Sequence, residues 1–205
     1  MRATRRRLSA APLLVVAALG VGACGSSSSS STTSSTPATT STAPAAAQIV
    51  GKSTSVVLNP ATAQILKASG ITVSPIAPAT AKKGLLVFPE SGGQIVVATL
   101  AGTIQHTGGL TLSHGGKSVQ LTNFVVNTTT KQITATVGGQ SVPIFNLNLA
   151  SVKRASGPNG TVLASNIALT LTPQAATVLS ASLEATIPNA GLPFGIATLT
   201  VAVKA

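Results

Sequence analysis

The stretch LAGTIQHTGGLTL, Leu100–Leu112, decides the fold class of this chain. On both sides of Gly108-Gly109, apolar residues alternate with polar or small ones, which is the two-residue period of a half-buried strand. Glycine tolerates the positive φ of tight turns, so a glycine pair between such runs predicts a β-hairpin. Similar pairs occur at Gly92-Gly93, Gly115-Gly116 and Gly138-Gly139. The pattern therefore predicts a mainly β domain with short turns.

Ten segments rich in Val and Thr predict strands along the chain. They span residues 54–58, 71–76, 85–88, 94–106, 110–114, 117–126, 131–137, 141–149, 161–171 and 196–203. Many short strands joined by short turns are typical of two packed sheets or of one sheet that rolls up. We therefore predict an antiparallel β-sandwich or rolled barrel, in a single domain over residues 48–205.

Two segments interrupt the β pattern and resemble each other, Leu58–Ser69 and Leu171–Ser182. In both, a residue that can cap a helix precedes a proline suited to the first helical position, at Asn59-Pro60 and Thr172-Pro173. Gly70 fits the end of the first helix. Each segment also carries an apolar stripe. We therefore predict two short capping α-helices, each covering an open end of the β core.

The N-terminal residues have the parts of a bacterial lipoprotein signal peptide. Arg2, Arg5, Arg6 and Arg7 form a basic region. The apolar run that follows, Leu13–Val21, is much shorter than the ~20 residues of a spanning helix. It ends in Val21-Gly22-Ala23-Cys24, a lipobox in which cleavage precedes the only cysteine and Cys24 is acylated. We predict a signal peptide over residues 1–23 and an extracytoplasmic protein anchored to membrane lipid. The arginines also fit a twin-arginine signal loosely, so the export route stays open.

Residues 24–47 form a predicted linker of Ser, Thr, Ala and Pro. The segment has no large apolar side chain, so it cannot bury enough surface to offset the entropy of ordering. As a flexible coil, its ends would lie ~27 Å apart. We predict a disordered spacer that holds the β domain away from the membrane.

The chain is basic, with 13 Lys and Arg against two acidic residues. Four of the arginines precede Cys24, which leaves nine basic residues and a net charge of about +7 on the mature chain. These residues are scattered, and the sequence has no Tyr or Trp that could stack on bases. Nucleic acid is therefore not a predicted partner. Scattered lysines favour solubility or a loose attraction to anionic envelope polymers.

Three parts of the predicted β domain carry a resemblance to one family. They are Leu100–Leu112, then Val119–Val126 with Thr134–Gly139, and finally Leu171–Leu179 with Gly191–Ala197. Their order resembles the Htaa domain, the haem-transport-associated module of secreted and surface proteins in Gram-positive bacteria. The resemblance implies a β-sandwich with a few short helices, a place in the cell envelope and a link to haem.

The resemblance also makes His106 a candidate ligand-binding residue. Family members that bind haem use a tyrosine on the iron, supported by a histidine from the hairpin motif, and His106 matches that histidine. This chain has no tyrosine, so the family's phenolate ligand is missing. Two interpretations stay open: His106 ligates iron in an apolar space near Leu100 and Ile104, or it bonds a backbone group at a hairpin end. His114, beside Gly115-Gly116, is predicted to be a turn residue.

The sequence offers few groups for catalysis. It has no Asp, so a Ser-His-acid site or a carboxylate pair would have to use Glu90 or Glu184. Neither a Gly-x-Ser-x-Gly nor a Ser-x-x-Lys motif occurs. A zinc site made of His106, His114 and Glu90 would lack any known ligand spacing. We therefore predict no catalytic residues, no metal site and a protein that is not an enzyme.

Two functions follow from these observations. The first is a non-catalytic envelope module that binds wall polymer or another protein, with an interior packed around Phe88, Phe124, Phe145 and Phe194. The alternative is a haem-binding or haem-relay surface protein with a pocket near His106. A void of several hundred Å³ beside His106 would favour a small-molecule site, whereas tight packing would favour the envelope module.

Overall fold

The computed structural model describes residues 44–187 and 191–204. Cys24, the predicted signal peptide and the predicted linker up to residue 43 lie outside these residues. The described residues fall within one structural unit, Thr42–Ala205. Its first strand begins at Ala47, one residue before the predicted start of the β domain.

Strands make up most of the described residues, as the sequence predicts. In chain order the elements are β1 (Ala47–Leu58), α1 (Pro60–Ala68), β2 (Thr72–Ile76), β3 (Thr80–Lys82), β4 (Leu85–Val96), β5 (Ala101–His106), β6 (Gly109–His114), β7 (Lys117–Asn127), β8 (Gln132–Val137), β9 (Gln140–Asn148), β10 (Lys153–Ser156), β11 (Thr161–Leu171), α2 (Pro173–Leu183) and β12 (Pro193–Lys204). The predicted mainly β class, with two short helices, is confirmed.

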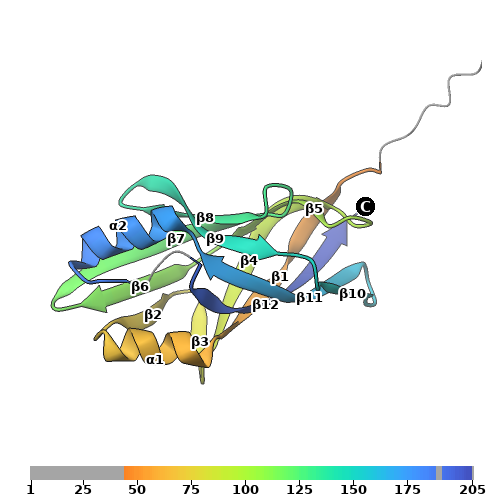
Figure 1. Ribbon diagram of the computed structural model, residues 1–205. Helices are drawn as coiled ribbons and strands as arrows, with labels where there is room; N and C mark the ends of the chain where they lie inside the picture. The colour runs from red at the N-terminus through yellow and green to blue at the C-terminus, as the bar shows by residue number, and fades with distance from the viewer. Residues whose placement is uncertain (1–43, 188–190, 205) are drawn as a thin grey trace, which may run out of the picture. The chain divides into compact units, whose positions relative to one another are not determined.

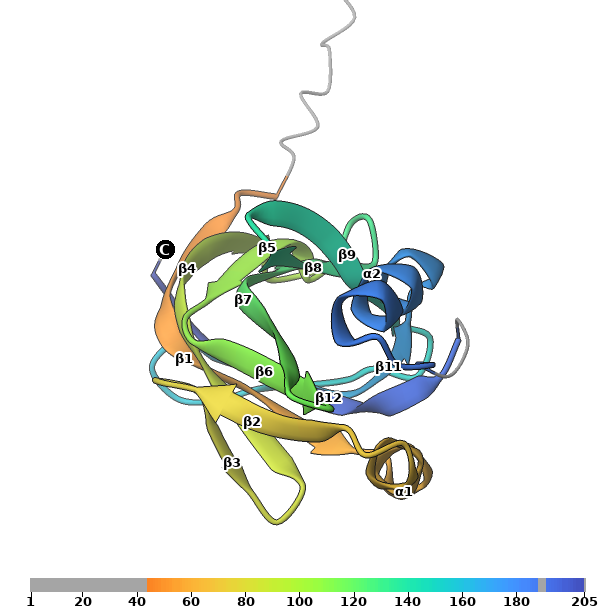
Figure 2. The ribbon, with the colours of Figure 1, turned by 90° about the vertical axis from the view of Figure 1, so that its left-hand side faces the viewer.

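Eight of the strands close into a barrel (Figures 1 and 2). Each strand pairs with the next in the order β7-β5-β4-β1-β12-β11-β9-β8, and β8 pairs with β7 to complete the ring. These pairings are antiparallel. β6 pairs with the first half of β7, β2 pairs with β6, and β3 and β10 are short additions to β4 and β11. Of the two predicted architectures, the rolled barrel is therefore the one observed.

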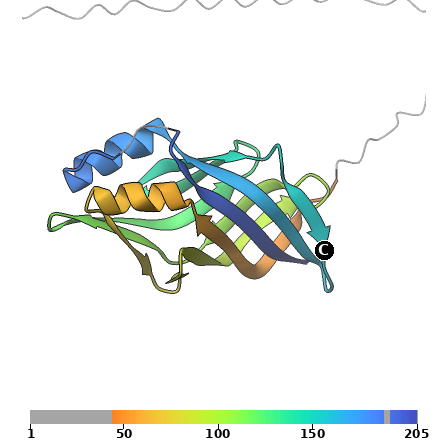
Figure 3. The ribbon, with the colours of Figure 1, turned by 60° about the horizontal axis from the view of Figure 1, so that its bottom comes forward.

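Both helices lie at one end of the barrel, and the first and last described residues lie at the other (Figures 1 and 3). β1 and β12 run antiparallel along this whole length, from the pairing of Gln48 with Lys204 to that of Leu58 with Gly195. The end-on view in Figure 2 shows α2 beside the open end of the barrel and α1 below β12. The two helices predicted to cover an open end of the β core therefore lie at the same end of the barrel.

The predicted helix caps are confirmed. The Asn59 side chain accepts a hydrogen bond from the backbone N–H of Ala61 at 2.9 Å, and Thr172 Oγ1 accepts one from Ala175 at 3.0 Å. Gly70 follows the last turn of α1 with a φ of +67°, the left-handed conformation that ends many helices. α2 packs against β6, β7 and β9. Neither α1 nor α2, the helices of the described residues, has the length and hydrophobicity of a membrane span.

Alternate side chains of the strands fill the barrel interior. On β8, for example, buried and half-buried residues alternate along the whole strand. The four phenylalanines form two aromatic pairs inside. The ring centroids of Phe88 and Phe124 are 5.3 Å apart in an edge-to-face arrangement, and those of Phe145 and Phe194 are 4.4 Å apart. The predicted packing around these four residues is thus observed.

The pair Gly92-Gly93, predicted as a turn, lies inside β4. This strand runs unbroken over Leu85–Val96, so the predicted division into two strands is wrong. A Cβ atom on Gly93 would stand 2.2 Å from the backbone oxygen of Thr103, which means that the glycine permits a close approach of β4 and β5. The turn comes later, at Val97–Leu100, where Leu100 itself adopts a φ of +60°.

Four further parts of the sheet differ from the prediction. Gly108-Gly109 does not form the predicted hairpin, because β5 and β6 do not pair with each other but with successive parts of β7. β1 begins seven residues earlier than predicted, because a bulge at Gly51 lets it continue past the irregular pattern there. β3 and β10 were not predicted at all. Their residues are exposed throughout, so they lack the alternation that marks a half-buried strand.

Candidate functional site

His106 is the last residue of β5, and its side chain lies inside the barrel with 5% of its surface exposed. Its Nδ1 is 3.3 Å from the backbone oxygen of Phe124, and its Nε2 is 2.7 Å from Thr54 Oγ1. Because a carbonyl oxygen can only accept, Nδ1 carries the hydrogen and Nε2 accepts from the Thr54 hydroxyl. Burial lowers the pKa of His106 to about 4, although the bond to Phe124 opposes this shift. The ring is therefore neutral at pH 7, with both nitrogens occupied.

The space beside His106 is small and apolar. The cavity there has a volume of about 30 Å³, and it is lined by His106, Thr54 and nine apolar side chains that include all four phenylalanines. A second cavity of about 40 Å³ lies under α1 and α2. Phe145 and Phe194 line both cavities, so this aromatic pair lies between them. The first void is about the size of one water molecule, far below the ~300–1,000 Å³ of a small-molecule site.

Glu90 faces His106 across the β4–β5 pair, in the same inward-pointing register. Only 9% of its surface is exposed, and neither carboxyl oxygen has a hydrogen-bond partner. Burial raises the pKa of Glu90 from 4.5 to about 8, because the charged form loses its hydration. Glu90 is therefore mostly protonated at pH 7. Together with His106 it forms a pair of neutral, buried titratable groups within the barrel.

Thr54 is the polar residue of this site that the sequence prediction missed. It was assigned only to the start of a strand, yet its side chain is 6% exposed and holds His106 in one orientation. The signal that could have found it is the alternation of Thr54 with Val56, which places both on the inward face of β1.

Comparison with known proteins identifies a similar fold but no match to the sequence. No family model matches the chain, and no curated protein matches it. Among solved structures, the C-terminal domain of HtaA from Corynebacterium glutamicum superimposes with a TM-score of 0.58 at 11% identity, covering 77% of this chain and 99% of that one. The domain is Htaa-like in its fold. A domain-swapped dimer of a histidine-to-alanine variant of the same HtaA domain aligns with a TM-score of 0.49 at 14% identity, over 71% of this chain and 91% of that one.

The interior of this Htaa-like domain does not fit haem. The cavity of about 30 Å³ beside His106 has no room for a porphyrin, and the nitrogen that would face iron is bonded to Thr54. The chain also has no tyrosine that could take the family's ligand position. Of the two interpretations of His106, the structure supports a histidine that is hydrogen-bonded to a backbone group at the end of a strand.

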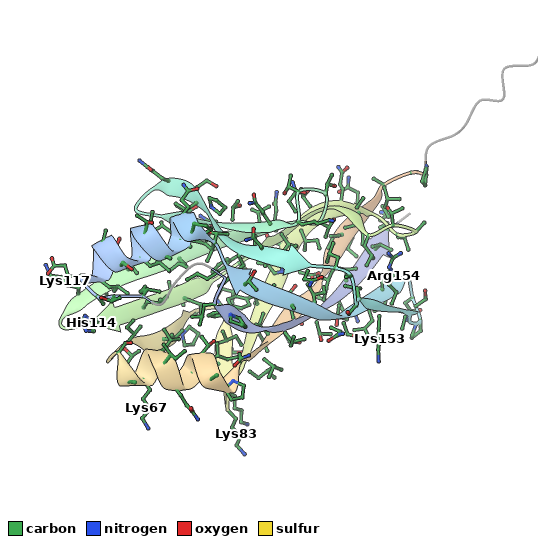
Figure 4. The ribbon with its side chains drawn as sticks, in the orientation of Figure 1. Lys67, Lys83, His114, Lys117, Lys153 and Arg154 are labelled. Atoms are coloured by element: carbon green, nitrogen blue, oxygen red, sulfur yellow. The ribbon has the colours of Figure 1, made fainter. Side chains whose placement is uncertain are left out.

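His114 flanks the Gly115-Gly116 turn, as predicted, and it also connects parts of the Htaa-like domain. It is the last residue of β6, and its Nδ1 lies 3.2 Å from the backbone oxygen of Leu183, at the end of α2. A Cβ atom on Gly70 would lie 3.5 Å from the imidazole, so the ring also adjoins the end of α1. Lys117 lies opposite His114 at the tip of the β6–β7 hairpin (Figure 4). It forms an ion pair of 3.0 Å with Glu184, just after α2. The hairpin tip therefore contacts the end of α2 and lies beside the end of α1.

The structure brings Glu90 and His106 to facing positions but leaves His114 at the hairpin tip. Within residues 44–187 and 191–204, no three His, Cys, Asp or Glu side chains are grouped as metal ligands would be. Glu90 lies inside the barrel, whereas Glu184 is exposed and paired with Lys117. The zinc set considered from the sequence is therefore not assembled, and the two carboxyl groups occupy separate environments.

Proposed function

We propose that this chain is an extracytoplasmic lipoprotein, anchored through an acylated Cys24, whose Htaa-like domain serves the cell envelope as a non-catalytic binding module. The lipobox Val21-Gly22-Ala23-Cys24 and the basic and apolar segments before it support the anchor. The Ser- and Thr-rich segment that follows is suited to a spacer, and the first strand begins directly after it, at Ala47.

The observation that carries this proposal is the filled barrel. His106, Thr54 and Phe124 satisfy one another, and the adjoining cavity has room for about one water molecule. A domain with this interior meets its partner on the outer surface. Because nine of the basic residues follow Cys24 and only two acidic residues oppose them, an anionic envelope polymer suits that surface.

The absence of a catalytic role is supported by the placement of the titratable groups. A general base or nucleophile must reach its substrate, whereas Glu90 and His106 face an apolar interior. Glu184 is accessible, but its carboxylate is held in an ion pair with Lys117. No pair of groups in this arrangement is placed to exchange a proton with a bound substrate.

Haem capture or relay is the competing function, and it has the family resemblance in its favour. An optical titration separates the two. We expect that micromolar mature chain mixed with haemin gives no Soret shift, because the site near His106 is closed. A shift that His106→Ala weakens, while His114→Ala at the hairpin tip leaves it unchanged, would overturn the proposal in favour of haem binding.

The anchor has its own test. Mass spectrometry of the chain from its native producer should show an N-terminal Cys24 that carries diacylglycerol, and a Cys24→Ser chain should keep its signal peptide and lose membrane retention. Globomycin, which blocks lipoprotein signal peptidase, should give the same uncleaved form. A cleaved chain without lipid on Cys24 would contradict the lipoprotein assignment without affecting the fold.

A further inference from the structure

The outer wall of the barrel carries a short row of exposed apolar side chains. Leu85 on β4, Val57 on β1 and Ile196 on β12 are 38%, 57% and 43% exposed. Val57 pairs with Leu85 on one side and with Ile196 on the other, so the three side chains are direct cross-strand neighbours. Single exposed apolar residues are ordinary, but adjoining ones mark interaction surfaces.

Lysines border this row. Lys82 pairs with Leu85 across β3 and β4, and Lys83 follows in the turn between these strands. Lys67 lies in the last turn of α1. Figure 4 shows Lys67 and Lys83 projecting from the same side of the domain, one from the helix and one from the turn. We call Leu85, Val57 and Ile196, together with these three lysines, the lysine-rimmed face.

No carboxylate balances these lysines. The sequence has only two acidic residues, of which Glu90 is buried in the barrel and Glu184 is paired with Lys117 at the tip of the β6–β7 hairpin. The lysine-rimmed face is therefore apolar at its centre and bordered by positive charge on the side of β3 and α1. This composition is complementary to a surface that is apolar just below a layer of negative charge.

We propose that the lysine-rimmed face docks on the surface of an anionic lipid bilayer. Leu85, Val57 and Ile196 would enter the boundary between headgroups and acyl chains, as the apolar faces of interfacial proteins do. A lysine lays its apolar stem along such a surface and extends its ammonium group to the phosphates. A second copy of the chain is a poorer partner, because a two-fold contact through this face would bring the lysine rims together.

This docking goes beyond the proposed function, places the domain on the bilayer and not away from it as the spacer prediction had it, and does not depend on acylation. An acyl chain at Cys24 would tether the domain, whereas the lysine-rimmed face would set which side of the barrel meets the headgroups. The opposite side, including the β6–β7 hairpin and α2, would then remain free for a partner in the envelope.

The experiment is co-sedimentation with lipid vesicles, using the chain from residue 24 onward with Cys24→Ser so that no acyl chain contributes. This chain retains the entire unit Thr42–Ala205. We expect binding to vesicles of equal parts phosphatidylglycerol and phosphatidylcholine, and little binding to phosphatidylcholine alone. Binding should weaken as salt rises, since charges at an exposed surface are screened.

Two double variants test the face itself. Lys82→Glu with Lys83→Glu should weaken binding to the anionic vesicles by about tenfold or more, because each lysine near the surface contributes separately. Lys131→Glu with Lys204→Glu makes the same charge change elsewhere. It is matched in backbone as well, since Lys83 and Lys131 both have positive φ, of 51° and 57°. The control should bind within about twofold of the parent chain.

The apolar row has a separate test. Val57→Ser should weaken vesicle binding severalfold and leave the melting temperature close to that of the parent, because Val57 is an exposed side chain. Equal losses from the two lysine variants would overturn the proposal by showing a general attraction of positive charge. Absence of binding at low salt, equal binding to both vesicle types, or dimerisation without vesicles that Val57→Ser abolishes would overturn it too.

Discussion

The inner and outer sides of β1 and β4 contrast sharply, although they belong to the same two strands. Inside, Thr54 and Phe88 pack with His106 around a space that holds about one water molecule. Outside, Val57 and Leu85 stand exposed as cross-strand neighbours. Neighbours of the same chemistry, such as Val56 and Val57, thus have opposite environments, because successive side chains of a strand point to opposite faces.

This contrast indicates where the domain keeps its charges. The inner side contains titratable groups, but burial favours their neutral forms: His106 loses its proton and Glu90 keeps one. The outer side carries the lysines. An interior of this kind contributes to stability, whereas contacts with partners are made at the outer surface. The predictions below test whether the two sides differ as sharply in energy as they do in structure.

The largest expected difference is between two neighbouring leucines of β4. Leu86 points inward and is 6% exposed, whereas Leu85 points outward and is 38% exposed. Leu86→Ala should lower the free energy of unfolding by about 2–5 kcal/mol, because it removes buried surface and leaves a cavity. Leu85→Ala should cost less than about 1 kcal/mol. Urea unfolding of both variants measures the difference, and equal losses would contradict the assignment of the two faces.

A smaller effect is expected from pH, because Glu90 and His106 shift in opposite directions. Between pH 4.5 and about 8, folded Glu90 holds a proton that the unfolded chain has released, so its contribution to stability falls as pH rises. Between about pH 4 and 6.5, folded His106 excludes a proton that the unfolded chain binds, so stability rises with pH. The two slopes oppose each other between pH 4.5 and 6.5. We expect the highest stability in that window and a loss above it.

Glu90→Gln separates the two groups. The variant should lose the decline above pH 6.5, where Glu90 acts alone and the slope approaches about 1.4 kcal/mol per pH unit. It should keep the decline that His106 causes as pH falls below 6.5, so its optimum moves upward. Chemical denaturation from pH 4 to 9 measures both limbs. An unchanged alkaline limb would mean that Glu90 is ionised or hydrated in the folded domain.

Much of this fold could be predicted from the sequence, because its signals are local. Alternation gave most of the strands, and Asn59-Pro60 and Thr172-Pro173 placed both helices to within a residue. Gly92-Gly93 was misassigned because the need for glycine there arises from the approach of a second strand. A turn such as Val97–Leu100, with leucine in a positive φ, has no compositional signal at all.

The site was predictable only in part. The family resemblance at Leu100–Leu112 identified His106, but the atoms that hold it come from residues 52 and 18 positions away along the chain. Whether His106 lines a pocket or a packed core depends on how β1, β5 and β7 meet around the barrel, which a strand pattern does not reveal. The neutral form of Glu90 likewise depends on the register of β4 against β5. The residue types thus identified the candidate site residues, whereas their burial and protonation depend on tertiary packing.

The smallest effect that still discriminates between the two sides concerns the Thr54 hydroxyl. Thr54→Val keeps the side-chain volume but removes the donor to His106 Nε2, which leaves a buried ring nitrogen without a partner. We expect a loss of about 1–2 kcal/mol in the free energy of unfolding. The outward neighbour offers the matched control: Ser55→Ala removes a hydroxyl whose bond to the Thr198 oxygen is long, at 3.4 Å, and should change stability by less than about 0.5 kcal/mol. If the two variants were equally stable, the hydrogen bond of His106 would contribute nothing to the closed interior, and an accessible imidazole would have to be considered again.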